Sequence, residues 1–169
     1  MPNTIPLAIV LIGMPGSGKS TCGQALASVL GKPFIDSDQL IEEEQQRSFQ
    51  SIVDAQGYRR LRAIEERILL KMPVKNQVIA TGGSAVYSAQ AMDRLQAAAT
   101  IIYLKCSLAT LQARINNLET RGLAKDPEQD FAALYEERRP LYERYATHTL
   151  SMDSLTVQQA VSHLAELVI

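Results

Sequence analysis

Eight residues near the N-terminus, Gly13-Met14-Pro15-Gly16-Ser17-Gly18-Lys19-Ser20, follow the phosphate-binding pattern G-x-x-x-x-G-K-[ST]. Glycines in such a loop let successive backbone N–H groups point inward, where they can bind phosphate oxygens. Lys19 would reach the β- and γ-phosphates, and the Ser20 hydroxyl would ligate Mg²⁺. A glycine-rich turn that matches by chance is the alternative. The motif predicts that a nucleoside triphosphate binds here, with contacts from Gly13, Gly16, Ser17, Gly18, Lys19, Ser20 and Thr21.

A second group of candidate residues is the acidic pair in Asp36-Ser37-Asp38, which follows a short predicted strand at 33–36. If this strand belongs to a parallel sheet, both carboxylates lie at its carboxyl end, where open α/β sheets bind ligands. One carboxylate could then reach the metal and the other a substrate hydroxyl. The alternative is that Asp38 only caps the helix that follows it.

Two later features could also contact a ligand. The turn Gly82-Gly83-Ser84 follows a predicted strand at 77–81, and its glycines would allow either a close approach of a ligand or a plain turn. Arg114 and Arg121 flank the polar segment 116–129, which we expect to be a mobile lid. Cations on such a lid could close over the phosphates, whereas ordinary surface arginines are the alternative.

An α/β fold must position these residues. Apolar runs at 7–12, 77–81 and 100–105 predict strands that are buried on both faces of a parallel sheet. Helical spacing follows the phosphate loop and recurs after the later strands, although Pro140 should kink or break its helix. The order β-α-β-α-α-β-α-β-lid-α-β-α predicts an α/β sandwich with a central parallel sheet of five strands.

The predicted helix at 57–72 has an apolar stripe of Leu61, Ile64 and Ile68, with Arg62 and Glu65 on the adjoining face. Arg62 has acidic residues three and four positions later in the chain. From spacing alone, this pattern favours a solvated ion pair that contributes a few tenths of a kcal/mol.

Length and composition exclude several classes of protein. The 169 residues suit one domain over 1–169, and 46% hydrophobic with 21% charged residues is typical of a globular protein. A net charge of −1 argues against a nucleic-acid-binding surface. We expect no membrane span and no signal peptide. Cys22 and Cys106 have no metal-site spacing and suit a reducing cytoplasm.

The chain resembles the shikimate kinases from about Ile9 to its final helix. The phosphate loop is common to many kinases, but five further motifs in the same order are more specific. They correspond to Asp36-Ser37-Asp38, Gly57 to Glu65, Gly82-Gly83-Ser84, Arg121-Gly122-Leu123 and Arg138-Arg139-Pro140-Leu141-Tyr142. The resemblance implies a fold like that of the nucleoside monophosphate kinases, with a substrate-binding helical part at about 38–72 and a lid at about 116–129. It also implies a monomeric cytoplasmic enzyme.

The resemblance further implies residue roles. Arg62 and Arg138 would hold the substrate carboxylate, which suits guanidinium forks. Asp38 would bind ring hydroxyls and accept or orient the proton of the attacking one. Gly82 and Gly83 would make backbone contacts to the substrate, and Asp36 would support Mg²⁺ together with Ser20. Arg121 would stabilise the transferring phosphoryl group beside Lys19. Arg114 would lie near the nucleotide base.

This chain departs from the family pattern at several positions. Ser84 replaces a third glycine, Tyr58 replaces an acid, Leu61 replaces an aromatic residue of the substrate pocket, and Gly122 replaces a proline. The expected reaction is the transfer of the γ-phosphoryl group of MgATP to the 3-hydroxyl of shikimate. A kinase for another carboxylated polyol such as gluconate, and a non-catalytic nucleotide-binding homologue, are the alternatives.

Overall fold

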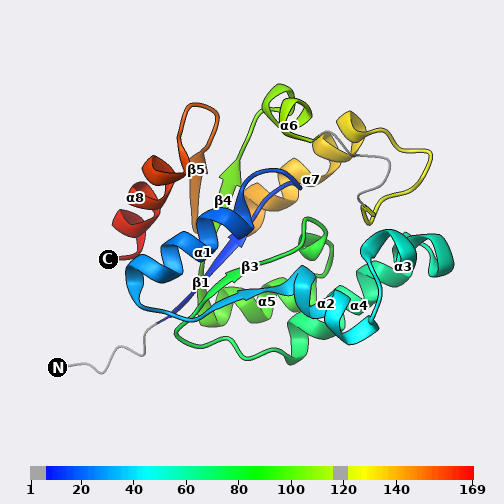
Figure 1. Ribbon diagram of the computed structural model, residues 1–169, viewed down its shortest axis with the longest axis horizontal. Coiled ribbons are helices and arrows are strands. Elements are labelled where there is room, and N and C mark those ends of the chain that lie inside the picture. Colours follow the sequence, from blue (N-terminus) through cyan, green and yellow to red (C-terminus); the bar gives the residue numbers. More distant parts are fainter. Residues whose placement is uncertain (1–6, 116–121) are drawn as a thin grey trace.

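The computed structural model describes residues 7–115 and 122–169. A five-stranded sheet lies at its centre, with the order β2-β3-β1-β4-β5 and with each neighbouring pair parallel (Figure 1). This arrangement confirms the predicted parallel sheet. The strands are β1 (Ala8–Ile12), β2 (Phe34–Asp36), β3 (Val78–Ala80), β4 (Ala99–Lys105) and β5 (His148–Ser151).

The sequence of the central strand β1 explains why it lies in the middle of the sheet. All five of its residues are apolar and buried, as expected for a strand with helices on both faces. Val10 pairs in register with Ile79 of β3 and with Ile101 of β4. The carboxyl end of β1 leads directly into the phosphate loop, so the loop starts from the buried centre of the sheet.

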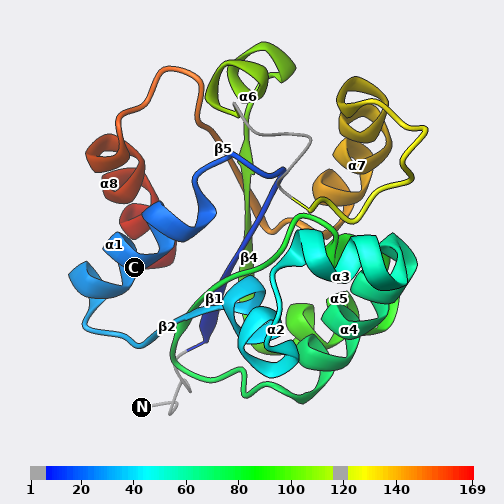
Figure 2. The same cartoon turned by 45° about the vertical axis from the view of Figure 1, so that its right-hand side comes forward.

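Helices cover both faces of the sheet (Figures 1 and 2). Helices α1 (Lys19–Leu30) and α8 (Val157–Val168) pack together on one face. On the other face, α5 (Ala89–Ala98) and α7 (Phe131–Tyr145) both contact β4. These three layers are the predicted α/β/α sandwich. The short helix α6 (Leu108–Arg114) follows β4.

Three consecutive helices form a separate wall beyond the sheet: α2 (Ser37–Gln45), α3 (Phe49–Gln56) and α4 (Tyr58–Lys71). They enclose a second apolar cluster, apart from the main core under the sheet. Ala124 belongs to this cluster, so residues 122–124, which we call the lid base, are held against the helices. The members of the cluster are Ile41, Ile52, Leu61, Ile64, Ile68 and Ala124.

The expectation that Pro140 breaks its helix is wrong, because α7 continues through Pro140 up to Tyr145. Pro140 and Glu136, whose carbonyl loses its helical N–H partner, both lie on the exposed side of the helix. Water can therefore satisfy that carbonyl, and the helix does not end at the proline. No helix within residues 7–115 and 122–169 is long and apolar enough to cross a membrane.

Candidate active site

The phosphate loop connects β1 to the N-terminus of α1, as the motif predicts, and Lys19 is the first residue of this helix. The Lys19 ammonium group is largely buried and donates to the carbonyl oxygens of Gly13 at 2.7 Å and Met14 at 2.9 Å. The partial positive charge of the helix N-terminus adds to that of Lys19. The loop therefore offers anions both backbone N–H groups and a held cation.

Ser20 and Asp36 meet at the carboxyl edge of the sheet. Ser20 Oγ donates to Asp36 Oδ2 at 2.5 Å, while Asp36 Oδ1 accepts from the backbone N–H of Asp38 at 2.9 Å. Asp36 is thus the N-cap of α2, and the alternative that Asp38 only serves as a cap is wrong. A hydroxyl beside a carboxylate fits Mg²⁺, which prefers oxygen ligands and few protein groups. No cluster of three or more His, Cys, Asp or Glu in the described chain could hold a metal by itself.

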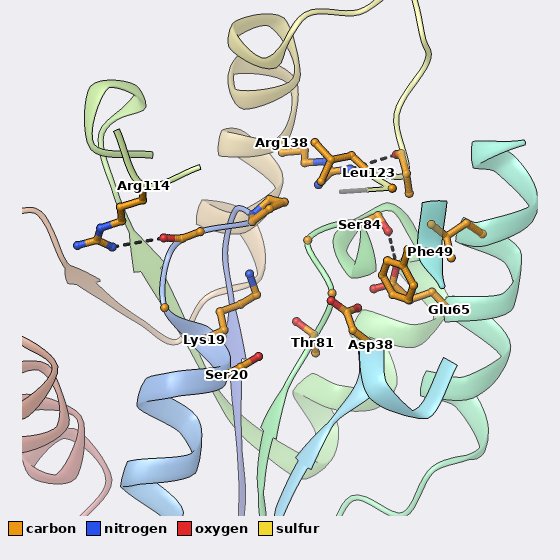
Figure 3. A pocket seen from close by; sticks show the side chains of 18 of the residues that line it. Lys19, Ser20, Asp38, Phe49, Glu65, Thr81, Ser84, Arg114, Leu123 and Arg138 are labelled. Carbon is orange, nitrogen blue, oxygen red and sulfur yellow. Dashed lines mark hydrogen bonds between the residues drawn. The ribbon is translucent and has the colours of Figure 1, made fainter. Parts of the chain in front are cut away.

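A cavity of about 330 Å³ opens beside the loop. In Figure 3, Lys19 and Ser20 face Asp38 and Glu65 across it. Five predicted nucleotide-binding residues of the loop and helix line the cavity, while Gly13 and Ser17 are buried below it. The residues on the far side come from α2, α3, α4, the turn after β3, the lid base and α7. They are Asp38, Phe49, Leu61, Glu65, Thr81, Gly82, Gly83, Ser84, Gly122, Leu123, Ala124 and Arg138.

Gly82 and Gly83 bring backbone to the cavity wall where no side chain would fit. A Cβ atom on Gly82 would overlap Asp38 Oδ1 and Glu65 Oε1. A Cβ atom on Gly83 would lie 2.7 Å from Arg138 Nη1 and 2.9 Å from Pro15 Cδ. The two glycines therefore allow both carboxylates and one guanidinium to approach the same short turn.

Glu65 is a buried carboxyl group beside Asp38. Only 3% of the residue is exposed, and Ser84 Oγ donates to its Oε2 atom. Its Oε1 atom accepts no hydrogen bond from the described residues. Burial raises the pKa of Glu65, although the Ser84 hydrogen bond and the charges of Arg138, Lys19 and Arg62 act in the opposite direction. Glu65 Oε1 can accept a hydroxyl hydrogen from a ligand.

Arg138 is a buried cation on the opposite wall. It is 1% exposed, and no carboxylate of the described residues forms an ion pair with it within 4.0 Å. Its Nε donates to the hydroxyl oxygen of Tyr87 at 3.3 Å and its Nη2 to the carbonyl oxygen of Ala124 at 3.1 Å. These acceptors are neutral. A bound anion would therefore compensate this buried charge.

Arg62 lies beside Arg138 and does not form the predicted helix ion pair. Its Nε donates to Ala124 O at 2.9 Å, and its Cζ lies 3.8 Å from the centre of the Tyr87 ring. No ion pair joins Arg62 to Glu65 or Glu66 in the described structure. The two arginines therefore converge on one carbonyl oxygen. Arg62 lines two other hollows and is absent from the lining of the main cavity.

The remaining predicted arginines lie elsewhere. Arg114 lines the end of the cavity next to the phosphate loop, where its Nη1 donates to Gly16 O at 3.4 Å. Arg121 and residues 116–120 of the expected lid lie outside the described residues. The described lid base is packed: Gly122 has a φ of 71°, and a Cβ atom there would overlap the backbone of Phe49 and Gln50. Glycine at 122 is therefore needed for the close contact with α3.

Sequence reasoning missed Glu65 as a cavity residue. Its spacing from Arg62 suggested a surface pair, yet it also lies four residues after Leu61 and three before Ile68. That spacing places Glu65 beside the buried stripe of α4. A carboxylate next to buried apolar residues is unusual, and this was the signal in the sequence that could have identified Glu65 as a site residue. Phe49 and Tyr87 had no comparable signal, because their contacts depend on segments far apart in the chain.

Comparison with known proteins agrees with this geometry. A sequence model of the family described as "Shikimate kinase" matches residues 15–168. A relative of that name from Paracidovorax citrulli is 38% identical over 165 residues, which cover 94% of this chain and 90% of the relative. Another from Actinobacillus pleuropneumoniae is 37% identical, covering 95% and 94%. A solved shikimate kinase from Acinetobacter baumannii, in complex with shikimate, superposes with a TM-score of 0.88 at 30% identity and covers 98% and 93% of the two chains.

Proposed function

The chain belongs to the shikimate kinase family, and we propose on that premise that it transfers the γ-phosphoryl group of ATP to the 3-hydroxyl of shikimate. The products are shikimate 3-phosphate and ADP, and the reaction serves aromatic amino-acid biosynthesis. The comparisons favour this substrate over the gluconate alternative. The acceptor is a small ring that carries a carboxylate and several hydroxyl groups, and the cavity has groups suited to each.

The observation that carries the proposal is the buried guanidinium of Arg138 across the cavity from a phosphate loop. No carboxylate of the described residues forms an ion pair with this cation, so it can bind an anionic ligand, and the phosphate loop already accounts for the anion of the nucleotide. The carboxylate of the acceptor supplies the second anion. Arg62 shares the acceptor Ala124 O with Arg138 but does not line the cavity, so the carboxylate would bind at Arg138 with Arg62 next to it.

The hydroxyl groups of the ring would face the two carboxyl groups beside Gly82. Asp38 would bind ring hydroxyls and accept or orient the proton of the one that attacks the γ-phosphorus. Glu65 Oε1 has the chemistry to accept a further hydroxyl hydrogen. The Gly82 and Gly83 backbone would lie against the ring, because no side chain intervenes there.

Phosphoryl transfer requires mainly positioning and charge neutralisation. Lys19 and the loop N–H groups would hold the β- and γ-phosphates, and Thr21 and Arg114 would contact the rest of the nucleotide. Ser20 and Asp36 would hold Mg²⁺, which neutralises phosphate charge when bound. We propose that Arg121, on the lid at about 116–129, joins the transferring phosphoryl group after closure.

The direct test is release of ADP in a coupled assay with shikimate, quinate or gluconate as acceptor and with Mg²⁺ present. We expect turnover with shikimate and much less with the other two. Lys19→Ala should abolish turnover while circular dichroism remains unchanged. Preference for gluconate would refute the substrate assignment. Nucleotide binding without turnover on any acceptor would instead identify a non-catalytic homologue.

A further inference from the structure

Tyr87 lies directly behind the two arginines and is not one of the residues that line the main cavity. It ends the short 3₁₀ turn η1 (Ala85–Tyr87), and its backbone N–H donates to Ser84 O at 3.1 Å. Only Ser84 separates this turn from Gly83, so the backbone that forms the cavity wall also fixes the position of Tyr87. The side chain lines a neighbouring hollow of about 260 Å³ together with Arg62.

The ring of Tyr87 contacts Arg62. The Arg62 Cζ atom lies 3.8 Å from the ring centre, well inside the roughly 6 Å limit for a cation–π contact. A guanidinium that stacks on an aromatic face keeps its N–H edge available for acceptors in its own plane. Arg62 uses that edge to reach Ala124 O through Nε. The Tyr87 ring is thus the nearer of two rings that contact the Arg62 guanidinium, with Tyr58 at 4.9 Å, and it does so without occupying the donors of Arg62.

The hydroxyl of Tyr87 contacts Arg138 by a different interaction. Tyr87 Oη accepts from Arg138 Nε at 3.3 Å and donates to Glu137 Oε1. The other oxygen of Glu137 accepts from Gln129 Nε2 at 2.8 Å, which fixes the carboxylate. Because the donor hydrogen of Tyr87 points to Glu137, its lone pairs face Arg138. The hydroxyl can therefore hold the guanidinium while Nη1 lies against Gly83 at the cavity wall.

We propose that Tyr87 is a positioning residue for substrate recognition, whose ring orients Arg62 and whose hydroxyl orients Arg138. One rigid side chain contacts both guanidiniums, and Ala124 O joins them on another side. The spacing between the two cations is thereby fixed before a carboxylate arrives, which lowers the ordering cost of binding. This inference rests on the proposed role of the arginine pair in binding the substrate carboxylate.

Two substitutions separate the two contacts. Tyr87→Phe keeps the ring on Arg62 and removes the hydroxyl from Arg138, so KM for shikimate should rise about three- to tenfold. Tyr87→Leu removes both contacts, and KM should rise about tenfold further. For both variants, kcat and KM for ATP should stay within about twofold of wild type, because neither contact reaches the phosphate side.

Tyr135→Phe is the matched control. It also loses a hydroxyl hydrogen bond, here to Cys106 O at 3.0 Å, but that bond does not involve Arg62 or Arg138. Its KM for shikimate should equal that of wild type. Thermal unfolding of all variants shows whether they are folded, and Tyr87→Phe carries the test if Tyr87→Leu is unfolded.

A shikimate analogue with an amidated carboxylate separates positioning from general packing. Its binding should be weak in every protein and should not distinguish wild type from the Tyr87 variants, since the arginines then hold no anion. Equal KM for shikimate in wild type and the folded variants would overturn the inference. So would Tyr87 variants that lose as much affinity for the amide, relative to wild type, as they lose for shikimate. A wild-type protein that does not phosphorylate shikimate would refute the proposed function itself, which is a distinguishable result.

Discussion

Arg138→Lys tests the carboxylate site most directly, because it keeps the buried charge and removes the guanidinium fork. The lysine would lose the bonds to Tyr87 Oη and Ala124 O and could not place a donor where Nη1 lies beside Gly83. Loss of one charge-assisted hydrogen bond from Nη1 to the substrate removes about 1.5–3 kcal/mol. At 1.4 kcal/mol for each factor of ten, KM for shikimate should rise about 10- to 140-fold.

The assay is steady-state kinetics with each substrate varied in turn. KM for ATP should not change, because the hydrogen bonds of Arg138 go to Tyr87 and Ala124 and not to the phosphate loop. The matched control is Arg139→Lys, since Arg139 is the adjacent residue and makes ion pairs only at the surface, with Glu136 at 3.3 Å and Glu143 at 3.4 Å. Such pairs contribute little, so this variant should behave as wild type. A folded Arg138→Lys enzyme with an unchanged KM for shikimate would show that Arg138 does not hold the carboxylate.

Three further predictions concern Glu65, the lid base and the lid. Burial raises the pKa of Glu65 in the folded state, so the wild type should lose stability as pH rises through that pKa. Glu65→Gln should therefore unfold at a higher temperature than wild type near pH 8 but not near pH 4, and thermal melts across this range that show no difference would contradict the assignment. Gly122→Ala should displace the lid base, because its Cβ atom would overlap the backbone of Phe49 and Gln50; we expect KM for shikimate to rise about tenfold, and an unchanged value would argue against the contact. Arg121→Ala should lower kcat by about 10²-fold or more with a smaller change in KM for ATP, whereas a large rise in that KM at constant kcat would make Arg121 a ground-state clamp.

The fold could be predicted where the signals were local. The apolar run of β1 and the glycine-rich loop after it specify their own conformations, so their positions follow from adjacent residues. Helix α3 was missed because it has only eight residues, and Ser48 at its N-cap marks it weakly. The effect of Pro140 was misjudged because burial decides it: on an exposed face, water replaces the lost backbone hydrogen bond.

The candidate site was predictable to the extent that residue type alone implied a role. Lys19, Ser20 and Asp36 lie together because their motifs follow β1 and β2, which lie on either side of β3 and end at the same edge of a parallel sheet. Spacing alone gave the wrong partner for Arg62, since its contacts come from Tyr87 and from residue 124, which lies 62 positions away. Glu65 was hidden for a related reason: its partner Ser84 lies on another element.

The bridge between Arg62, Arg138 and the lid base is a main-chain carbonyl, that of Ala124. Every amino acid carries this group, so alanine scanning cannot detect the contact. For the same reason, the side chain at this position can change during evolution while the acceptor is kept. We expect position 124 to drift among small apolar residues that still fit the cluster of α2, α3 and α4 while the bridge is inherited. Protein semisynthesis can change this backbone carbonyl, whereas mutagenesis cannot. An ester in place of the peptide bond between residues 124 and 125 would weaken this acceptor and leave every side chain in place, although it would also remove the Lys125 N–H that donates to Leu123 O at 2.9 Å.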